Sequence, residues 1–131
     1  PGGNLGKDLK KISEIMHIGK SLPLAKANDK MTKTLITMTK KSFGCIGVIN
    51  LKNELLGIIT DGDLRRNMGK DIINKTAKEV MTKKPLTADN NTLVGEAINI
   101  MNLRKITSLF VCHKKKPVGI VHIHDLLRLS S

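Results

Sequence analysis

Two stretches of the chain combine residue types that can hold a phosphorylated ligand. In the first, GIITDGDLRR at positions 57–66, an apolar run ends at Thr60 and two aspartates, Asp61 and Asp63, follow. The unpaired amides at a helix start attract phosphate, so we expect the Thr60 hydroxyl and the amides of 61–64 to face one anion. The two oxygens of Asp63 suit the adjacent hydroxyls of a ribose or another sugar. The alternative is that Thr60 and Asp63 only cap the helix.

The second stretch, GIVHIHDLLR at positions 119–128, repeats the first in the same frame. His122 replaces the threonine, whereas Asp125 retains the second aspartate. An imidazole can donate a hydrogen bond to phosphate and gains charge near neutral pH. The second half-site is therefore predicted to be sensitive to pH or to prefer a different anion.

Two equivalent arginines, Arg66 and Arg128, follow these aspartates by about one helical turn. Each can add positive charge to its site, although ordinary surface arginines would show the same pattern. The spacing His122-x-His124 resembles a metal-binding pair, because alternate residues of a strand share a face. No third ligand has a suitable spacing, so we expect histidines of the core or of a helix start and no metal site.

The elements that position these residues are predicted in the order strand, helix, strand, strand, helix for the first copy, which the second copy retraces. The first copy has an extended piece at 24–27, a helix carrying Met31, Leu35 and Met38 on its buried face, strands at 45–49 and 55–60 and a helix from 61. The second has a helix over 93–104, strands at 109–112 and 118–122 and a helix from about 124. Two small sheets of this kind need a covering layer of helices, which predicts an α+β fold.

The segments before and between the copies carry helix signals of their own. Leu5, Leu9, Ile12 and Met16 recur at helical spacing and predict an amphipathic helix of about three turns. The pair Thr76 and Glu79 predicts a capping box that opens a short helix. Asn28 or Asp29 is expected to cap the first long helix, and Asn90 or Asn91 the second. The phrase at 14–16 (EIM) is matched by that at 79–81 (EVM).

Composition limits the class of protein. The chain has 131 residues, 40% of them hydrophobic, which is enough for one shared core. The net charge of +12 comes mostly from scattered lysines, and without Trp or Tyr there is little to stack on bases, so we expect solvated lysines and no nucleic-acid partner. The lysine cluster at 114–116 is interpreted as a solvated turn, with a phosphate or partner contact as the alternative.

Other motifs are missing or point to a cytoplasmic piece of a longer protein. No apolar run is long enough for a membrane span, and we expect no membrane partner. Cys45 and Cys112 lie in apolar runs and are predicted to be buried thiols without a disulfide. The start PGGN is linker-like. No catalytic arrangement of Ser, His and Asp or of Cys and His, no P-loop and no dinucleotide motif is present, so no catalytic residue is expected.

With these motifs the chain resembles a tandem pair of CBS domains, a Bateman module. It is most similar to the C-terminal module of the bacterial D-arabinose 5-phosphate isomerase family. The phrases that carry the resemblance span almost the whole chain: PGGNLGK at 1–7, IMH at 15–17, GIITDGDLRR at 57–66, VMT at 80–82, ITSL at 106–109 and VHIHDLL at 121–127. In CBS pairs the threonine and aspartate of this motif contact phosphate and ribose, which agrees with the local argument for Thr60 and Asp63.

The resemblance implies two β-α-β-β-α repeats with pseudo-twofold symmetry and two clefts between them. The expected organisation is 1–11 as a linker and helix start from an absent sugar-isomerase domain, 12–68 as the first repeat, 69–75 as a linker and 76–131 as the second repeat. Such pairs usually associate again, so a homodimer is expected.

The resemblance also implies a regulatory role without activity of its own. The parent enzyme would interconvert D-ribulose 5-phosphate and D-arabinose 5-phosphate for the lipopolysaccharide sugar Kdo. The expected ligand is a nucleotide or nucleotide sugar, with AMP, ATP and CMP-Kdo as candidates, held by residues of both motifs: Thr60, Asp61, Asp63, Arg66, His122, Asp125 and Arg128. The alternative is a structural module that holds enzyme subunits together and binds nothing.

Overall fold

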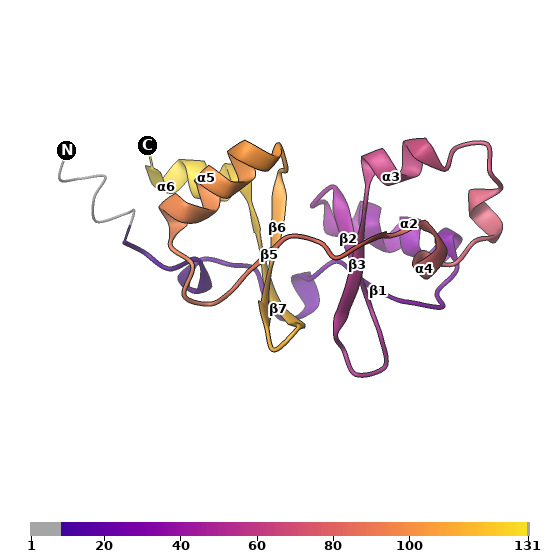
Figure 1. Ribbon diagram of the computed structural model, residues 1–131, viewed down its shortest axis with the longest axis horizontal. Helices are drawn as coiled ribbons and strands as arrows, with labels where there is room; N and C mark the ends of the chain where they lie inside the picture. The colour runs from indigo at the N-terminus through magenta and orange to yellow at the C-terminus, as the bar shows by residue number, and fades with distance from the viewer. Residues whose placement is uncertain (1–8, 131) are drawn as a thin grey trace. The chain divides into compact units, whose positions relative to one another are not determined.

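The computed structural model describes residues 9–130, and these divide into two compact units. One unit, here the Thr60 unit, contains residues 20–85 and 114–116. The other, here the His122 unit, contains residues 9–19, 86–113 and 117–130. Residues 9–19, at the start of the first repeat, therefore belong to the His122 unit, and residues 76–85, at the start of the second repeat, belong to the Thr60 unit. The first residue of β7 (Lys116–His122) lies in the Thr60 unit, and the first residue of η2 (Gly19–Ser21) lies in the His122 unit. Figure 1 labels the elements along the chain.

The Thr60 unit is built on a four-stranded sheet in the order β1-β2-β3-β4. Its strands are β1 (Leu24–Lys26), β2 (Cys45–Ile49), β3 (Leu55–Thr60) and β4 (Thr82–Lys83). β1 runs parallel to β2, whereas β3 is antiparallel to both β2 and β4. Its helices are α2 (Met31–Lys41), α3 (Asp61–Arg66), α4 (Ala77–Val80) and the 3-10 turns η2 (Gly19–Ser21) and η3 (Ile72–Asn74). The core joins Met31 and Met38 of α2 to Ile46, Val48 and Ile59 of the sheet.

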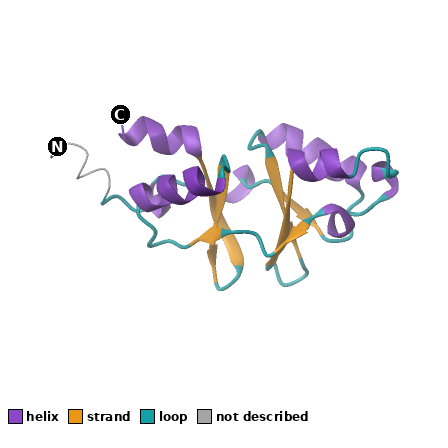
Figure 2. Cartoon of the chain, turned by 45° about the horizontal axis from the view of Figure 1, so that its top comes forward, coloured by secondary structure: helices purple, strands orange, loops and turns teal. Residues whose placement is uncertain are grey.

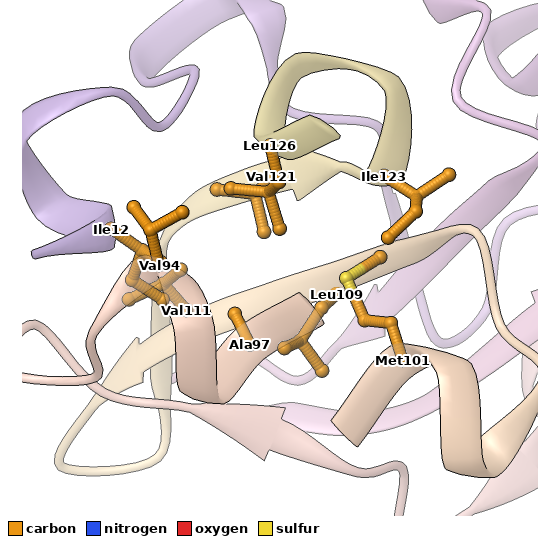
Figure 3. Packing of buried hydrophobic residues seen from close by; sticks show 9 residues of the cluster. All are labelled: Ile12, Val94, Ala97, Met101, Leu109, Val111, Val121, Ile123 and Leu126. Carbon is orange, nitrogen blue, oxygen red and sulfur yellow. The ribbon is translucent and has the colours of Figure 1, made fainter. Parts of the chain in front are cut away.

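The His122 unit has a three-stranded sheet in the order β5-β6-β7. It comprises β5 (Thr87–Ala88), β6 (Ser108–His113), β7 (Lys116–His122), the helices α5 (Val94–Arg104) and α6 (Ile123–Ser130) and the 3-10 turn η1 (Ile12–Glu14). Figure 3 shows its core, in which side chains from α5, both long strands and α6 pack together with Ile12. In Figure 2 the long helices of each unit lie beside that unit's sheet.

The predicted α+β fold with the element order strand, helix, strand, strand, helix is confirmed in both copies. The capping box at Thr76 is also confirmed, because its amide donates to Glu79 Oε1 at 2.9 Å. Cys45 and Cys112 form no disulfide in the described part of the chain; Cys45 is buried and Cys112 half-buried. Within residues 9–130 no helix is both long enough and apolar enough to cross a membrane.

The predicted three-turn helix over 5–16 is wrong for its described part, and residues 5–8 lie outside the described residues. Residues 9–16 contain only the 3-10 turn η1. The Ile12 amide donates to the Thr92 carbonyl at 2.8 Å, and the Lys10 carbonyl accepts from the Val94 amide at 2.8 Å. These bonds hold the segment against the start of α5, so its backbone groups are not available for a regular helix.

The predicted caps of the long helices are wrong as well. The N-cap of α2 is Lys30, since Asp29 instead accepts from the Lys26 amide at 2.9 Å and closes the preceding turn. The N-cap of α5 is Leu93, whose amide donates to Glu96 at 3.0 Å. Asn90 and Asn91 lie in the turn before this helix. In this turn the side-chain bonds come from Asp89, whose Oδ1 accepts from the Asn91 amide at 2.8 Å, and from Thr92, whose hydroxyl oxygen accepts from the Asp89 amide at 3.2 Å.

Candidate functional site

The junction of β3 with α3 places Thr60 and Asp63 side by side. The Thr60 amide donates to Asp63 Oδ2 at 2.9 Å, and the Thr60 hydroxyl donates to the same oxygen at 3.2 Å. In return the Asp63 amide donates to the threonine oxygen at 3.4 Å. Together these bonds form a capping box, so Thr60 and Asp63 do cap α3, and ligand binding at the pair stays a prediction.

The Asp63 carboxylate is buried, at 3% exposure, and receives further donors. Arg66 Nη2 lies 2.5 Å from Oδ1, and the Thr82 hydroxyl also donates to Oδ1. Burial would raise the pKa of Asp63, but the hydrogen bonds from Thr82, Thr60 and Arg66 outweigh burial and hold its pKa below the usual value. Asp63 is therefore an ionised carboxylate whose bonds in this structure come from its own unit.

Thr82 reaches Asp63 because β4 lies close against β3, with Ile58 opposite Thr82. Gly57 makes this approach possible. A Cβ atom at Gly57 would lie 2.6 Å from the Thr82 carbonyl oxygen and 2.7 Å from Met81 Sδ. The glycine of the motif is thus needed for the pairing that carries the Thr82 hydroxyl to the carboxylate.

The His122 unit contains the same construction. His17 pairs with Ile120 of β7, with backbone bonds of 2.9 and 3.0 Å. A Cβ atom at Gly119 would overlap the Met16 side chain, as one at Gly57 would overlap Met81. His17 then bonds Asp125, with Nε2 2.8 Å from Oδ2. Met16 and His17 therefore take the places that Met81 and Thr82 hold in the Thr60 unit.

Asp125 is held in the same way as Asp63 but is more open to solvent. Its side chain is 25% exposed, against 4% for Asp63. Arg128 donates to its Oδ1. Burial would raise the pKa of Asp125, but the hydrogen bonds from His17 and Arg128 lower it by more, so the pKa lies below the usual value.

His122 and His124 lie together at the start of α6. Their rings stack with centroids 4.8 Å apart, and the His124 amide donates to His122 Nδ1 at 3.1 Å. The pKa of His122 is lowered, first by burial, then by His124 and His17, while Asp125 acts in the opposite direction. The described residues contain no group of three or more His, Cys, Asp or Glu side chains that could hold a metal ion.

The remaining predicted site residues differ in position. Arg66 and Arg128 each bond their own aspartate, while their side chains are 67% and 77% exposed. Asp61 is exposed and lines a separate hollow with Leu35 and Leu64. The structure thus gathers all predicted residues except the Asp61 side chain around two carboxylates, one in each unit.

The model of the CBS domain family matches this chain twice, at residues 12–70 and 77–131. The chain belongs to the CBS domain family. The tandem CBS pair predicted from the motifs is thus confirmed.

The similar proteins are longer than this CBS pair. It is 43% identical to an uncharacterized protein of Rickettsia prowazekii, over 99% of this chain and 41% of that protein. It is 39% identical to arabinose 5-phosphate isomerase KdsD of Yersinia pestis, over 98% of this chain and 40% of that protein. The CBS pair therefore spans about 40% of the length of these relatives.

Solved structures share the fold over nearly the whole chain. The CBS domain of a CBS-containing membrane protein from Sphaerobacter thermophilus is 25% identical, with a TM-score of 0.77 over 98% of this chain and 92% of that one. An uncharacterized conserved protein from Pyrococcus horikoshii is 26% identical, with a TM-score of 0.78 over 94% of this chain and 93% of that one.

Sequence reasoning missed two residues that contact the carboxylates of this CBS pair. Thr82 is 19 positions from Asp63, and His17 is 108 positions from Asp125. One signal was present in the sequence. When the matched phrases 14–16 and 79–81 are extended by one residue, His17 aligns with Thr82. Because the contact partners lie in the other sequence repeat, the local motif did not point to them.

Proposed function

We propose that this CBS pair is the regulatory part of a longer arabinose 5-phosphate isomerase and that it binds a nucleotide or nucleotide sugar. One observation carries the proposal: each unit has an ionised carboxylate at a strand-to-helix junction, with an exposed arginine bonded to it. Carboxylate oxygens suit ribose hydroxyls, and an arginine that can turn toward solvent suits phosphate.

The two half-sites differ in how readily a ligand can enter. Ribose hydroxyls at Asp63 have to replace Thr82 or Arg66, because these groups now occupy Oδ1. Arg66 can then turn toward a phosphate, since its side chain is 67% exposed. At Asp125 the larger exposed fraction of the carboxylate leaves easier access. Binding thus exchanges internal bonds for ligand bonds and releases Thr82 or His17.

Neighbours in the fold support a nucleotide only in general terms. The structure of CBSX2 contains AMP, that of a bacterial CNNM/CorC CBS domain contains ATP, and that of the MJ0100 CBS pair contains 5'-methylthioadenosine and S-adenosyl-L-methionine. Their identities to this chain are 21%, 14% and 23%, which show the shared fold alone. For this chain, the ligand class rests on its own carboxylates and arginines.

The remaining parts of the proposal follow from the resemblance to KdsD. We place the linker at 1–11, the repeats at 12–68 and 76–131 and the connection at 69–75, after an N-terminal sugar-isomerase domain. That domain would interconvert D-ribulose 5-phosphate and D-arabinose 5-phosphate for Kdo and lipopolysaccharide synthesis, and this chain would have no isomerase activity. AMP, ATP and CMP-Kdo are the ligands to test, and self-association into a dimer in the cytoplasm is the proposed state.

A structural module without a ligand is the second candidate. The observation in its favour is that Asp63 is already bonded within its unit. In that case the two carboxylates only fasten Thr82 and His17 to their sheets, and the pair serves to join enzyme subunits.

Thermal unfolding with AMP, ATP, CMP and CMP-Kdo separates the two candidates. A ligand that binds only the native state at a hundred times its Kd raises the free energy of unfolding by about 2.7 kcal/mol. We expect a shift with at least one of these nucleotides, its loss in Asp63→Ala combined with Asp125→Ala, and its retention in Asp71→Asn, which removes one carboxylate before the 3-10 turn η3. Unchanged melting with all four ligands supports the structural module.

A further inference from the structure

The two half-sites place different donors at equivalent positions. Around Asp63 the residues are Thr82 and Thr60, with glycine at position 62. Around Asp125 all three equivalent positions carry histidine: His17, His122 and His124. A threonine hydroxyl stays neutral across the physiological pH range, whereas an imidazole can take up a proton and become positively charged within it.

The three imidazoles and the carboxylate form one electrostatic group. His17 Nε2 contacts Asp125 at 2.8 Å, from the segment paired with β7. The pKa of His122, at the end of β7, is lowered by burial and by the neighbouring His124 and His17, whereas Asp125 raises it. Arg128 from α6 bonds the same carboxylate. Asp125 thus bonds one imidazole and one guanidinium, and two further imidazoles stack on one another at the start of the same helix.

We propose that His17, His122 and His124 make the half-site at Asp125 a proton-gated anion site, which binds a phosphate group more tightly as pH falls, whereas the half-site at Asp63 shows no such gating. This inference rests on the proposed function, because it assigns a regulation to one of its two half-sites. The ligand class is the phosphate of a nucleotide or nucleotide sugar.

The gating follows from the stacked histidine pair. Two protonated rings with centroids 4.8 Å apart repel one another, so protonation is costly while the site is empty. An anion beside the rings offsets that repulsion and favours their protonated forms. By linkage, protonation then raises anion affinity by up to about tenfold per pH unit for each proton taken up.

The test follows the histidine ring protons by NMR between about pH 8 and pH 5 in sodium sulfate and in sodium chloride of equal ionic strength. Sulfate is the probe because it mimics a phosphate group and keeps its charge over this range. We expect sulfate to raise the pKa of His122 and to bind at least tenfold more tightly at the acidic end. His113 is an internal control at the exposed end of β6, and sulfate should leave its titration curve unchanged.

A variant series assigns the effect to the site. His17→Thr, His122→Thr and His124→Gly together copy the residues of the Thr60 unit and should abolish the pH dependence of sulfate binding. His122→Gln alone, which keeps a neutral donor, should reduce it. Equal sulfate effects on His113 and His122, or pH dependence that survives the triple change, would overturn the inference.

Thermal unfolding with nucleotides at two pH values distinguishes a failure of this inference from a failure of the proposed function. CMP-Kdo is the nucleotide for this comparison, because its phosphodiester keeps its charge between about pH 8 and pH 6, whereas the monoester of AMP titrates at about 6. Thermal shifts with CMP-Kdo that are equal at the two pH values would preserve the nucleotide site and overturn the gating. Proton-linked sulfate binding without any nucleotide shift would preserve the gated anion site and remove the nucleotide. Each result contradicts one statement and leaves the other standing.

Discussion

At the scale of single residues, the buried carboxylate of Asp63 is the main polar anchor of the Thr60 unit. Its replacement in Asp63→Ala leaves Thr82 and Arg66 without their acceptor. We expect a loss of about 2–3 kcal/mol in the free energy of unfolding, measured by urea denaturation. Asp125→Ala should cost about 1 kcal/mol, because that carboxylate is more exposed. Equal losses at the two positions would contradict this difference.

The lowered pKa values of the two aspartates and His122 predict how stability changes with pH. For Asp63 and Asp125 the folded-state pKa is below the ordinary 3.8, so their contribution is complete above 3.8 and is lost as pH falls through the folded value. For His122 the folded pKa is below 6.5, so the native state resists protonation and stability decreases as pH falls below 6.5.

Melting curves between about pH 8 and pH 5 isolate the histidine part of this profile. In His122→Gln the decrease below 6.5 should be smaller than in the wild type. A profile that is identical in both proteins would show that this imidazole does not contribute.

What the sequence could predict at this scale was local. The contact of Thr60 with Asp63 followed from a spacing of three residues, which a helix start brings together. The arginine contacts followed from the same helical turn. The contacts of Thr82 and His17 depend on strand pairing between distant segments, which no local period encodes.

At the scale of elements, the glycines of β3 and β7 control how closely the neighbouring segment packs. Gly57→Ala brings a Cβ against the Thr82 backbone and should cost about 1–3 kcal/mol. Gly62→Ala is the matched control, because its nearest neighbours are the ends of the Arg66 and Thr60 side chains at 3.3 and 3.5 Å. We expect little change in the control.

The two glycines differ in a way that a double mutant can detect. At Gly119 the nearest atoms all belong to the Met16 side chain, whereas at Gly57 the nearest is a backbone oxygen. Met16→Ala should therefore offset much of the cost of Gly119→Ala, with a coupling of about 1 kcal/mol. Met81→Ala should offset less of the cost of Gly57→Ala. Similar couplings in thermal unfolding would contradict this distinction.

The long helices and strands were predictable because their apolar periods extend over many residues. The start of α2 was not, since Asp29 closes a turn and the helix begins without a side-chain cap. β4 has only two residues and therefore carries no period at all. The helix expected over 5–16 failed in its described part because backbone bonds to Thr92 and Val94 replaced helical bonds.

At the scale of the whole molecule, the compact units do not coincide with uninterrupted sequence repeats. A fragment of residues 20–85 keeps β4 and Thr82, whereas residues 12–68 lack both. We expect the longer fragment to show more protected amides in hydrogen exchange and a cooperative melt. Fragments of this size are marginally stable, so cooperativity is the more sensitive readout. Equal protection in both fragments would show that β4 is not needed.

In each unit, the segment that bonds the aspartate continues along the chain into the other unit. The Thr82 hydroxyl donates a hydrogen bond to Asp63, and the chain continues through Pro85 into β5, an edge strand of the other sheet. His17 is hydrogen-bonded to Asp125, and the chain continues through η2 into β1, an edge strand of the four-stranded sheet. A ligand of the kind proposed above that displaced Thr82 or His17 would therefore release a segment that continues directly into an edge strand of the other unit's sheet.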